Sequence, residues 1–191
     1  MSRRLLTVAA TAFLAALPAK ANEFEGALRD LAEGQLMGWM AEPALIDAIN
    51  AQNAAHTGLS QADIDALDQT WRAEIGAAVS PMIDDILARP GSSILRERKE
   101  AAGGLITEVF VTDNRGLNVA QSDITSDLWQ GDEAKFTESY GTPQGTIHFG
   151  DIELDDSTQT YQSQISFPVY DPALNVVIGA VTFGVNLELL N

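Results

Sequence analysis

Side chains able to contact a small molecule gather in the C-terminal half of this chain. Small-molecule sites combine an apolar or aromatic wall with a few polar groups, and this half supplies both kinds. The candidate ligand contacts are Trp129, Tyr161, Asp132, Gln130, Gln121, Phe149 and Ser163. Two alternatives stay open: Trp129 packs into a small core, as buried aromatics commonly do, and Asp132 is solvated on a helix surface. Asp132 and Glu133 are neighbours, which point about 100° apart on a helix, so only one of them can reach a ligand.

Catalytic motifs are missing from the sequence. The chain has no Cys, which excludes disulfides, thiol catalysis and Cys-based zinc sites. His56 and His148 are far apart and belong to no His-Glu-x-x-His motif, and neither a P-loop nor a Gly-x-Ser-x-Gly elbow is present. We therefore expect neither an enzyme nor a cofactor.

One acidic cluster has the oxygen ligands that calcium prefers. Its members are Asp151, Glu153, Asp155 and Asp156. The regular Asp-x-Asp-x-Asp-Gly spacing with a terminal Glu is absent. A solvated acidic loop is also ordinary in a chain of net charge −16. Whether this loop binds a cation stays open.

The N-terminus has the three parts of a secretory signal. Arg3 and Arg4 precede an apolar run that ends at Pro18, and Ala19-Lys20-Ala21 is a small-x-small cleavage site. The apolar run is shorter than the roughly 18 residues that a membrane span requires. We predict cleavage after residue 21 and a periplasmic protein without a membrane span.

The charge of the chain excludes several classes of partner. Cleavage would leave 8 of the 11 basic residues against 27 acidic ones, a formal charge of −19. Binding to nucleic acid or anionic lipid requires clustered Lys and Arg, so neither partner is expected. A chain of this length can bury a sufficient core without disulfides.

Apolar residues at helical spacing predict helices in residues 22–104. One helical stretch covers residues 23–55, with a break near Pro43. Ser60, with Asp63 three residues later, marks the start of the next helix. The apolar stripe of that helix is Ile64, Leu67, Trp71, Ile75, Val79, Ile83 and Ile86. Whether Pro81 kinks the helix stays open, and Pro90-Gly91 ends it.

The remaining sequence alternates as strands do. Residues 109–121 predict a hairpin with an Asn-Arg-Gly turn, which leads into a short amphipathic helix containing Trp129. Residues 161–169 and 176–185 predict a second hairpin, and residues 146–154 one or two weak strands. Helices first and an antiparallel sheet second indicate an α+β fold. The long helices should cover one face of the sheet, which leaves the other face for a pocket.

Two segments carry a resemblance to a known family. They are Ser126-Asp127-Leu128-Trp129-Gln130-Gly131-Asp132-Glu133-Ala134-Lys135-Phe136 and Val177-Ile178-Gly179-Ala180-Val181-Thr182-Phe183. With the order of elements, they resemble the extracytoplasmic Cache family, PAS-like sensors of bacterial receptors and histidine kinases. The resemblance covers about residues 105–187. It implies an α+β domain with long N-terminal helices packed on a PAS-like antiparallel sheet of about five strands.

The sequence departs from that family at informative positions. Leu128-Trp129 stands where receptors often have two aromatics, and Lys135-Phe136 stands in place of paired tryptophans. The Arg-x-Trp-Tyr signature of amino-acid-binding Cache domains is absent, so the resemblance implies no amino-acid ligand.

The resemblance implies a stand-alone, single-Cache sensor. Residues 1–21 would be the signal peptide, 22–104 the helical region and 105–191 the sheet, with residues 22–191 forming one domain. We expect it to bind a small molecule such as an organic acid or amine. No membrane helix follows the last strand, so a membrane histidine kinase or chemoreceptor would have to carry the signal.

Two rival functions stay open. One is an interaction or adaptor protein that forms a homodimer through its long helices and has a vestigial pocket. The other is an enzyme or metal-binding protein of unrecognised type.

Overall fold

The structure, a computed structural model, describes residues 23–155 and 160–190. The signal segment predicted at residues 1–21 and the carboxylate of Asp156 lie outside these ranges. Within them, no helix is both long and apolar enough to cross a bilayer.

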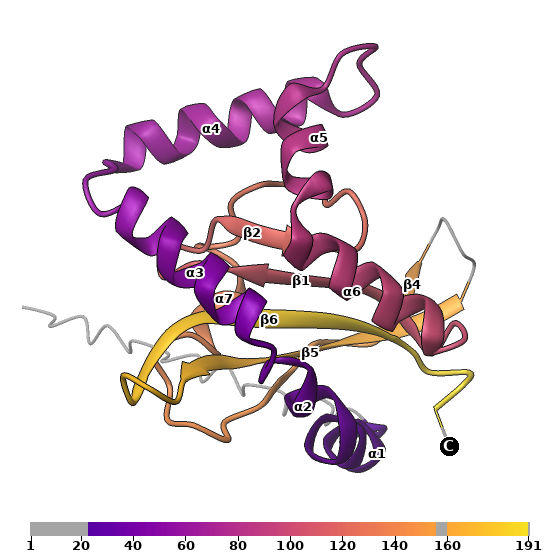
Figure 1. Cartoon of the computed structure of the whole chain (residues 1–191). Coiled ribbons are helices and arrows are strands. Elements are labelled where there is room, and N and C mark those ends of the chain that lie inside the picture. Colours follow the sequence, from indigo (N-terminus) through magenta and orange to yellow (C-terminus); the bar gives the residue numbers. More distant parts are fainter. Residues whose placement is uncertain (1–22, 156–159, 191) are drawn as a thin grey trace, which may run out of the picture.

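A series of helices precedes the sheet (Figure 1). They are α1 (Glu25–Leu31), a π-helical stretch (Ala32–Leu36), α2 (Met37–Trp39), α3 (Pro43–Ala55), α4 (Gln61–Glu74), α5 (Pro81–Ala88) and α6 (Pro90–Ala101). Three of them begin with proline, because the missing N–H of proline is no loss in the first turn. The predicted break near Pro43 is confirmed, since α2 ends before it and α3 begins at it.

Helix α4 begins with the predicted capping box. The backbone N–H of Asp63 donates to the Ser60 hydroxyl, and the backbone N–H of Ser60 donates to the Asp63 carboxylate. Two N–H groups without a partner inside the helix are thereby satisfied. The Ser60 hydroxyl also donates to the Asp63 carboxylate at 2.7 Å. This bond, followed by the one from the Ser60 N–H, lowers the pKa of Asp63.

The predicted apolar stripe does not form one helix. Helix α4 stops at Glu74, and α5 starts at Pro81. Gly76 has a φ of 74°, a left-handed conformation that typically terminates a helix. Ile75 and Val79 consequently lie in the connecting loop and are 44% and 75% exposed.

The strands form one antiparallel sheet in the order β2-β1-β6-β5-β3, and β4 also pairs with β5. Their bounds are β1 (Ile106–Thr112), β2 (Asn118–Gln121), β3 (His148–Phe149), β4 (Glu153–Asp155), β5 (Thr160–Asp171) and β6 (Val176–Asn186). Both predicted hairpins and the two weak strands are confirmed. The fold is α+β, with long N-terminal helices packed on an antiparallel sheet.

The prediction of a helix around Trp129 was wrong. Helix α7 covers only Ala134–Thr137, and Trp129 precedes it in an isolated β-bridge with Leu117. The backbone N–H groups of Leu128 and Trp129 donate to the Asp68 carboxylate at 2.9 and 3.0 Å. Because a side chain on a distant helix satisfies these amides, the segment runs extended.

The two faces of the sheet have different covers. Helices α3 and α6 cross the near face in Figure 1. Val109 and Val111 of β1 belong to the core on that face. Phe110 lies between them in sequence and points to the opposite face, where Lys135 of α7 lies over its ring.

Two apolar cores hold these layers together. The main core joins the sheet to the helices, and its largest buried members include Phe183, Leu28, Leu36, Leu45, Ile49 and Ile165. The smaller core lies under α4 and α5 and contains Ile64, Trp71, Ile83, Ile86, Leu117 and Leu128. The α4–α5 hairpin therefore rests on a core of its own.

Candidate ligand pocket

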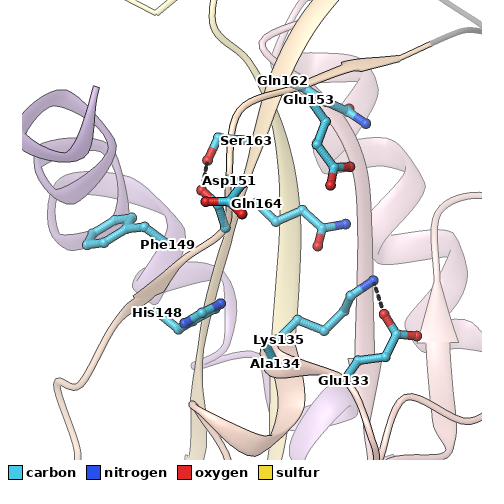
Figure 2. A pocket seen from close by; sticks show the side chains of 11 residues that line it. Glu133, Ala134, Lys135, His148, Phe149, Asp151, Glu153, Gln162, Ser163 and Gln164 are labelled. Atoms are coloured by element: carbon cyan, nitrogen blue, oxygen red, sulfur yellow. Dashed lines mark hydrogen bonds and ion pairs between the residues drawn. The ribbon is translucent and has the colours of Figure 1, made fainter. Parts of the chain in front are cut away.

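A pocket of about 350 Å³ opens beside strand β5, toward the start of α7 (Figure 2). Strand β5 contributes Gln162, Ser163 and Gln164 to its lining. The segment around the start of α7 contributes Glu133, Ala134 and Lys135. The remaining lining residues come from β3, β4 and the connection between them: His148, Phe149, Gly150, Asp151 and Glu153. Three separate segments between residues 133 and 164 thus meet beside β5.

Hydrogen bonds hold the β5 side of the pocket in place. The Ser163 hydroxyl donates to the carbonyl oxygen of Gly150 at 2.8 Å, and the N–H of Gly150 donates to the carbonyl oxygen of Gln164 at 2.8 Å. These bonds join β5 to the chain after β3. The backbone there is already oriented, and a ligand need not order it.

The two glutamine side chains are oriented by strand β1. Gln164 Nε2 donates to Glu108 Oε1 at 3.1 Å. Gln162 Oε1 accepts from the Thr107 hydroxyl at 3.0 Å. Gln164 therefore has its oxygen left to accept a hydrogen bond, and Gln162 has its nitrogen left to donate one.

Lys135 supplies the positive charge in the lining. Its Nζ lies 3.0 Å from Glu133 Oε2 and 5.6 Å from the centre of the Phe110 ring. The Lys135 side chain is 20% exposed, so most of its stem is buried while the ammonium reaches the pocket. The carboxylates of Glu133, Asp151 and Glu153 oppose this single ammonium.

Two of the seven candidate contacts line the pocket. Ser163 does so from β5 and Phe149 from β3. In Figure 2 the Phe149 ring points away from Lys135, toward α1, where the Arg29 guanidinium lies 5.0 Å from the ring centre. Tyr161 is 53% exposed and is not among the residues that line the pocket. Asp132 is exposed next to the lining residue Glu133.

Trp129 is partly buried beside the smaller core, which is close to the alternative left open for it. It packs against that core, and its Nε1 donates to the carbonyl oxygen of Arg115 at 2.8 Å. Gly131 makes room for the ring, because a Cβ at this position would clash with Trp129 Nε1. Trp129 therefore braces the β1–β2 turn and does not line the pocket.

Gln121 and Gln130 are buried away from the pocket. Gln130 Nε2 donates to the carbonyl oxygen of Asp127. Gln121 Oε1 accepts from Asn118 Nδ2 at 3.0 Å. Two buried atoms here, Gln121 Nε2 and Asn118 Oδ1, have no hydrogen-bond partner among the described residues. A water molecule could bridge one donor and one acceptor of this kind. That Gln121 or Gln130 contacts a ligand stays a prediction.

The acidic cluster is divided by the structure. Asp151 and Glu153 line the pocket, whereas Asp156 lies outside the described residues. Among the residues that the structure describes, no three His, Cys, Asp or Glu side chains gather closely enough to hold a metal ion.

Sequence reasoning missed Lys135, Gln162 and Gln164 as pocket residues, and it considered Glu133 only as one of two neighbouring carboxylates of which one could reach a ligand. Gln162 and Gln164 did carry a signal, because they alternate with the apolar side chains of β5 and so belong to the opposite face. Lys135 gave none. Its position depends on how the segment before α7 folds back over β1.

Remote structural matches are found among known proteins, whereas no family model and no curated protein matches the chain. The ligand-binding domain of the Campylobacter jejuni chemoreceptor Tlp3, in complex with L-norvaline, is 16% identical with a TM-score of 0.41, covering 84% of this chain and 62% of that chain. The extracellular domain of vpHK1S-Z8, described as a histidine kinase, is 16% identical with a TM-score of 0.48, covering 88% and 55%.

The sensor domain of the Vibrio cholerae histidine kinase DctB is a further match. It is 14% identical with a TM-score of 0.38, covering 87% of this chain and 58% of that chain. This chain thus spans between 55% and 62% of the length of these three structures.

Proposed function

We propose that this protein is a small-molecule-binding sensor module, and that its ligand binds in the pocket between β5 and α7. The observation that carries the proposal is the pocket itself: about 350 Å³ of space on a pre-ordered strand, lined by amides, carboxylates and one ammonium. Ligand sites in proteins commonly have about 300–1,000 Å³ and a few convergent polar groups. The free face of the sheet is where the α+β arrangement leaves room for such a site.

The wider role rests on the sequence. The predicted signal segment supports secretion into the periplasm, and the Cache resemblance supports a sensor that acts through a membrane histidine kinase or chemoreceptor. The adaptor alternative, with a vestigial pocket, would require that this space bind nothing. An enzyme is not supported by any motif in the chain.

A thermal-shift screen of metabolites tests the proposal. A ligand that binds only the native state stabilises it by about 2.7 kcal/mol at a hundred times its Kd. For a domain of this size that corresponds to a rise in Tm of about 5–11 °C. Calorimetric titration of each hit should then show saturation.

A pair of matched variants locates the binding. Gln164→Ala removes an amide from the pocket wall and should reduce the Tm shift of a hit. Gln69→Ala removes an exposed amide on α4 and should leave the shift unchanged. A broad panel without any saturable hit, or hits that both variants affect equally, would reject the pocket as the ligand site.

A further inference from the structure

We infer that the ligand of this pocket is a small cation that carries at least one ammonium group. The inference rests on the proposed function and names the chemical class of the ligand. The free groups of the lining decide the class: after its internal pairing, the pocket offers mainly negative charge.

The charges of the lining do not balance. Glu133, Asp151 and Glu153 contribute three carboxylates, and Lys135 contributes one ammonium. Lys135 pairs with Glu133 at 3.0 Å, so these two charges largely cancel. Asp151 and Glu153 then have no oppositely charged partner among the described residues. An anionic ligand would be repelled by both, and a cation would be attracted.

Of the two glutamines in the lining, Gln164 agrees with the charges, whereas Gln162 has its nitrogen left to donate. Because Gln164 Nε2 donates to Glu108, its oxygen is the atom that can meet a ligand. In Figure 2 the ends of Glu153, Gln164 and Lys135 lie on the same side of β5. Two of these three ends, the carboxylate and the amide oxygen, accept hydrogen bonds. An ammonium has three donors and no acceptor, which suits such a pair.

The pocket already holds one ammonium, that of Lys135. Its Nζ lies between the Glu133 carboxylate and the face of Phe110, at 5.6 Å from the ring centre. This combination of a carboxylate and an aromatic face is one that proteins use to bind amine cations. The pocket thus stabilises an alkylammonium at one end and leaves carboxylates for a second one at the other.

Three probes with the same four-carbon chain test the inference: butane-1,4-diamine, 4-aminobutanoate and butanedioate. Calorimetric titration at low ionic strength should rank their affinities in that order, from the dication to the dianion. Added salt should weaken binding of the diamine, since exposed charge pairs are screened. The reverse order would overturn the inference.

Charge-removing variants locate the diamine. Glu153→Gln and Asp151→Asn should each weaken its binding about two- to fivefold, the range for an exposed ion pair. Lys135→Gln should leave the affinity unchanged or raise it, because it removes the competing cation. Glu138→Gln changes an exposed carboxylate that is not among the lining residues and should have no effect. Equal weakening in Glu138→Gln and Glu153→Gln would mean diffuse attraction to an acidic protein and would overturn the site.

The outcomes separate the two claims. Butanedioate that binds, and loses its affinity in Lys135→Gln, would overturn the cation inference and leave the sensor proposal standing. Absence of binding by the diamine would also overturn the inference. Absence of any hit in the wider metabolite screen would reject both.

Discussion

At the scale of single residues, Asp171 shows how the turn between β5 and β6 is attached to a helix. Its Oδ2 accepts from Asn50 Nδ2 of α3 at 2.7 Å, and its Oδ1 accepts from the N–H groups of Ala173 and Leu174 at 2.8 and 3.2 Å. These bonds, that from Asn50 above all, lower the pKa of Asp171 against a smaller opposing effect of burial. They favour the ionised form.

Asn50→Ala should therefore destabilise the protein in a pH-dependent way. A carboxylate with a lowered pKa in the folded state stabilises that state above its unfolded pKa, about 3.9 for Asp, and the effect disappears as the pH falls through the folded value. Urea unfolding should show a loss in the variant at pH 7 that shrinks at pH 3. Asn114→Ala, an exposed position, is the control. An equal loss at both pH values would contradict this account.

At the scale of elements, helix α3 is tied to the first hairpin through Asp113. This buried carboxylate lies 2.8 Å from His56 Nδ1 and accepts from Gln52 Nε2 at 3.0 Å. Its other oxygen accepts from the backbone N–H groups of Arg115 and Leu117. One side chain thus fixes both the turn and the end of the helix above it.

Asp113→Ala should lower the free energy of unfolding by about 2–4 kcal/mol, because it leaves several buried donors without an acceptor. His56→Ala removes one partner, which is 25% exposed, and should cost about 1 kcal/mol. Chemical denaturation at pH 7 measures both. A loss below 1 kcal/mol for Asp113→Ala would show that other contacts hold the turn to α3, such as the bond from the Asn114 N–H to Asn53 Oδ1.

The same elements show what a sequence reveals. Capping at Ser60 and alternation along β5 are local signals, and both correctly predicted structure. The segment around Trp129 has helix-like polarity, yet it is extended because Asp68, on a distant helix, accepts from its amides. The helix predicted through Ile75 does not continue, because Gly76 takes the left-handed conformation. The periodicity of apolar residues could not predict which distant segments contact each other.

At the scale of the whole molecule, the candidate site was predictable only in part. A pocket was expected on the free face of the sheet, and Gln162 and Gln164 line one from that side, whereas Ser163 lies on the side of β5 that carries the core residue Ile165. Lys135 lines this pocket and Trp129 packs against the smaller core, so a ligand contact through Trp129 stays a prediction. Alternation along a strand predicts which face of the sheet each side chain lies on. Which loop covers that face depends on tertiary packing.

The presence of two cores predicts that the molecule opens in parts. Trp71 is fully buried in the smaller core, and its Nε1 donates to the carbonyl oxygen of Thr125 at 2.9 Å. Trp71→Ala should cost about 3–5 kcal/mol. The main core lies under other helices, so the cost should fall mainly on the α4–α5 hairpin. Regions with a small core of their own open independently of the rest.

Hydrogen exchange read segment by segment distinguishes this local opening from global unfolding. In Trp71→Ala the amides of α4 and α5 should exchange faster, while those of β5 and β6 keep their protection. Ile49→Ala, which creates a cavity in the main core, should instead lower protection across α3, β5 and β6. If Trp71→Ala lowered the protection of β5 and β6 as much as that of α4, the two cores would unfold as one cooperative unit. The hairpin would then have no independent motion that ligand binding or a partner could use.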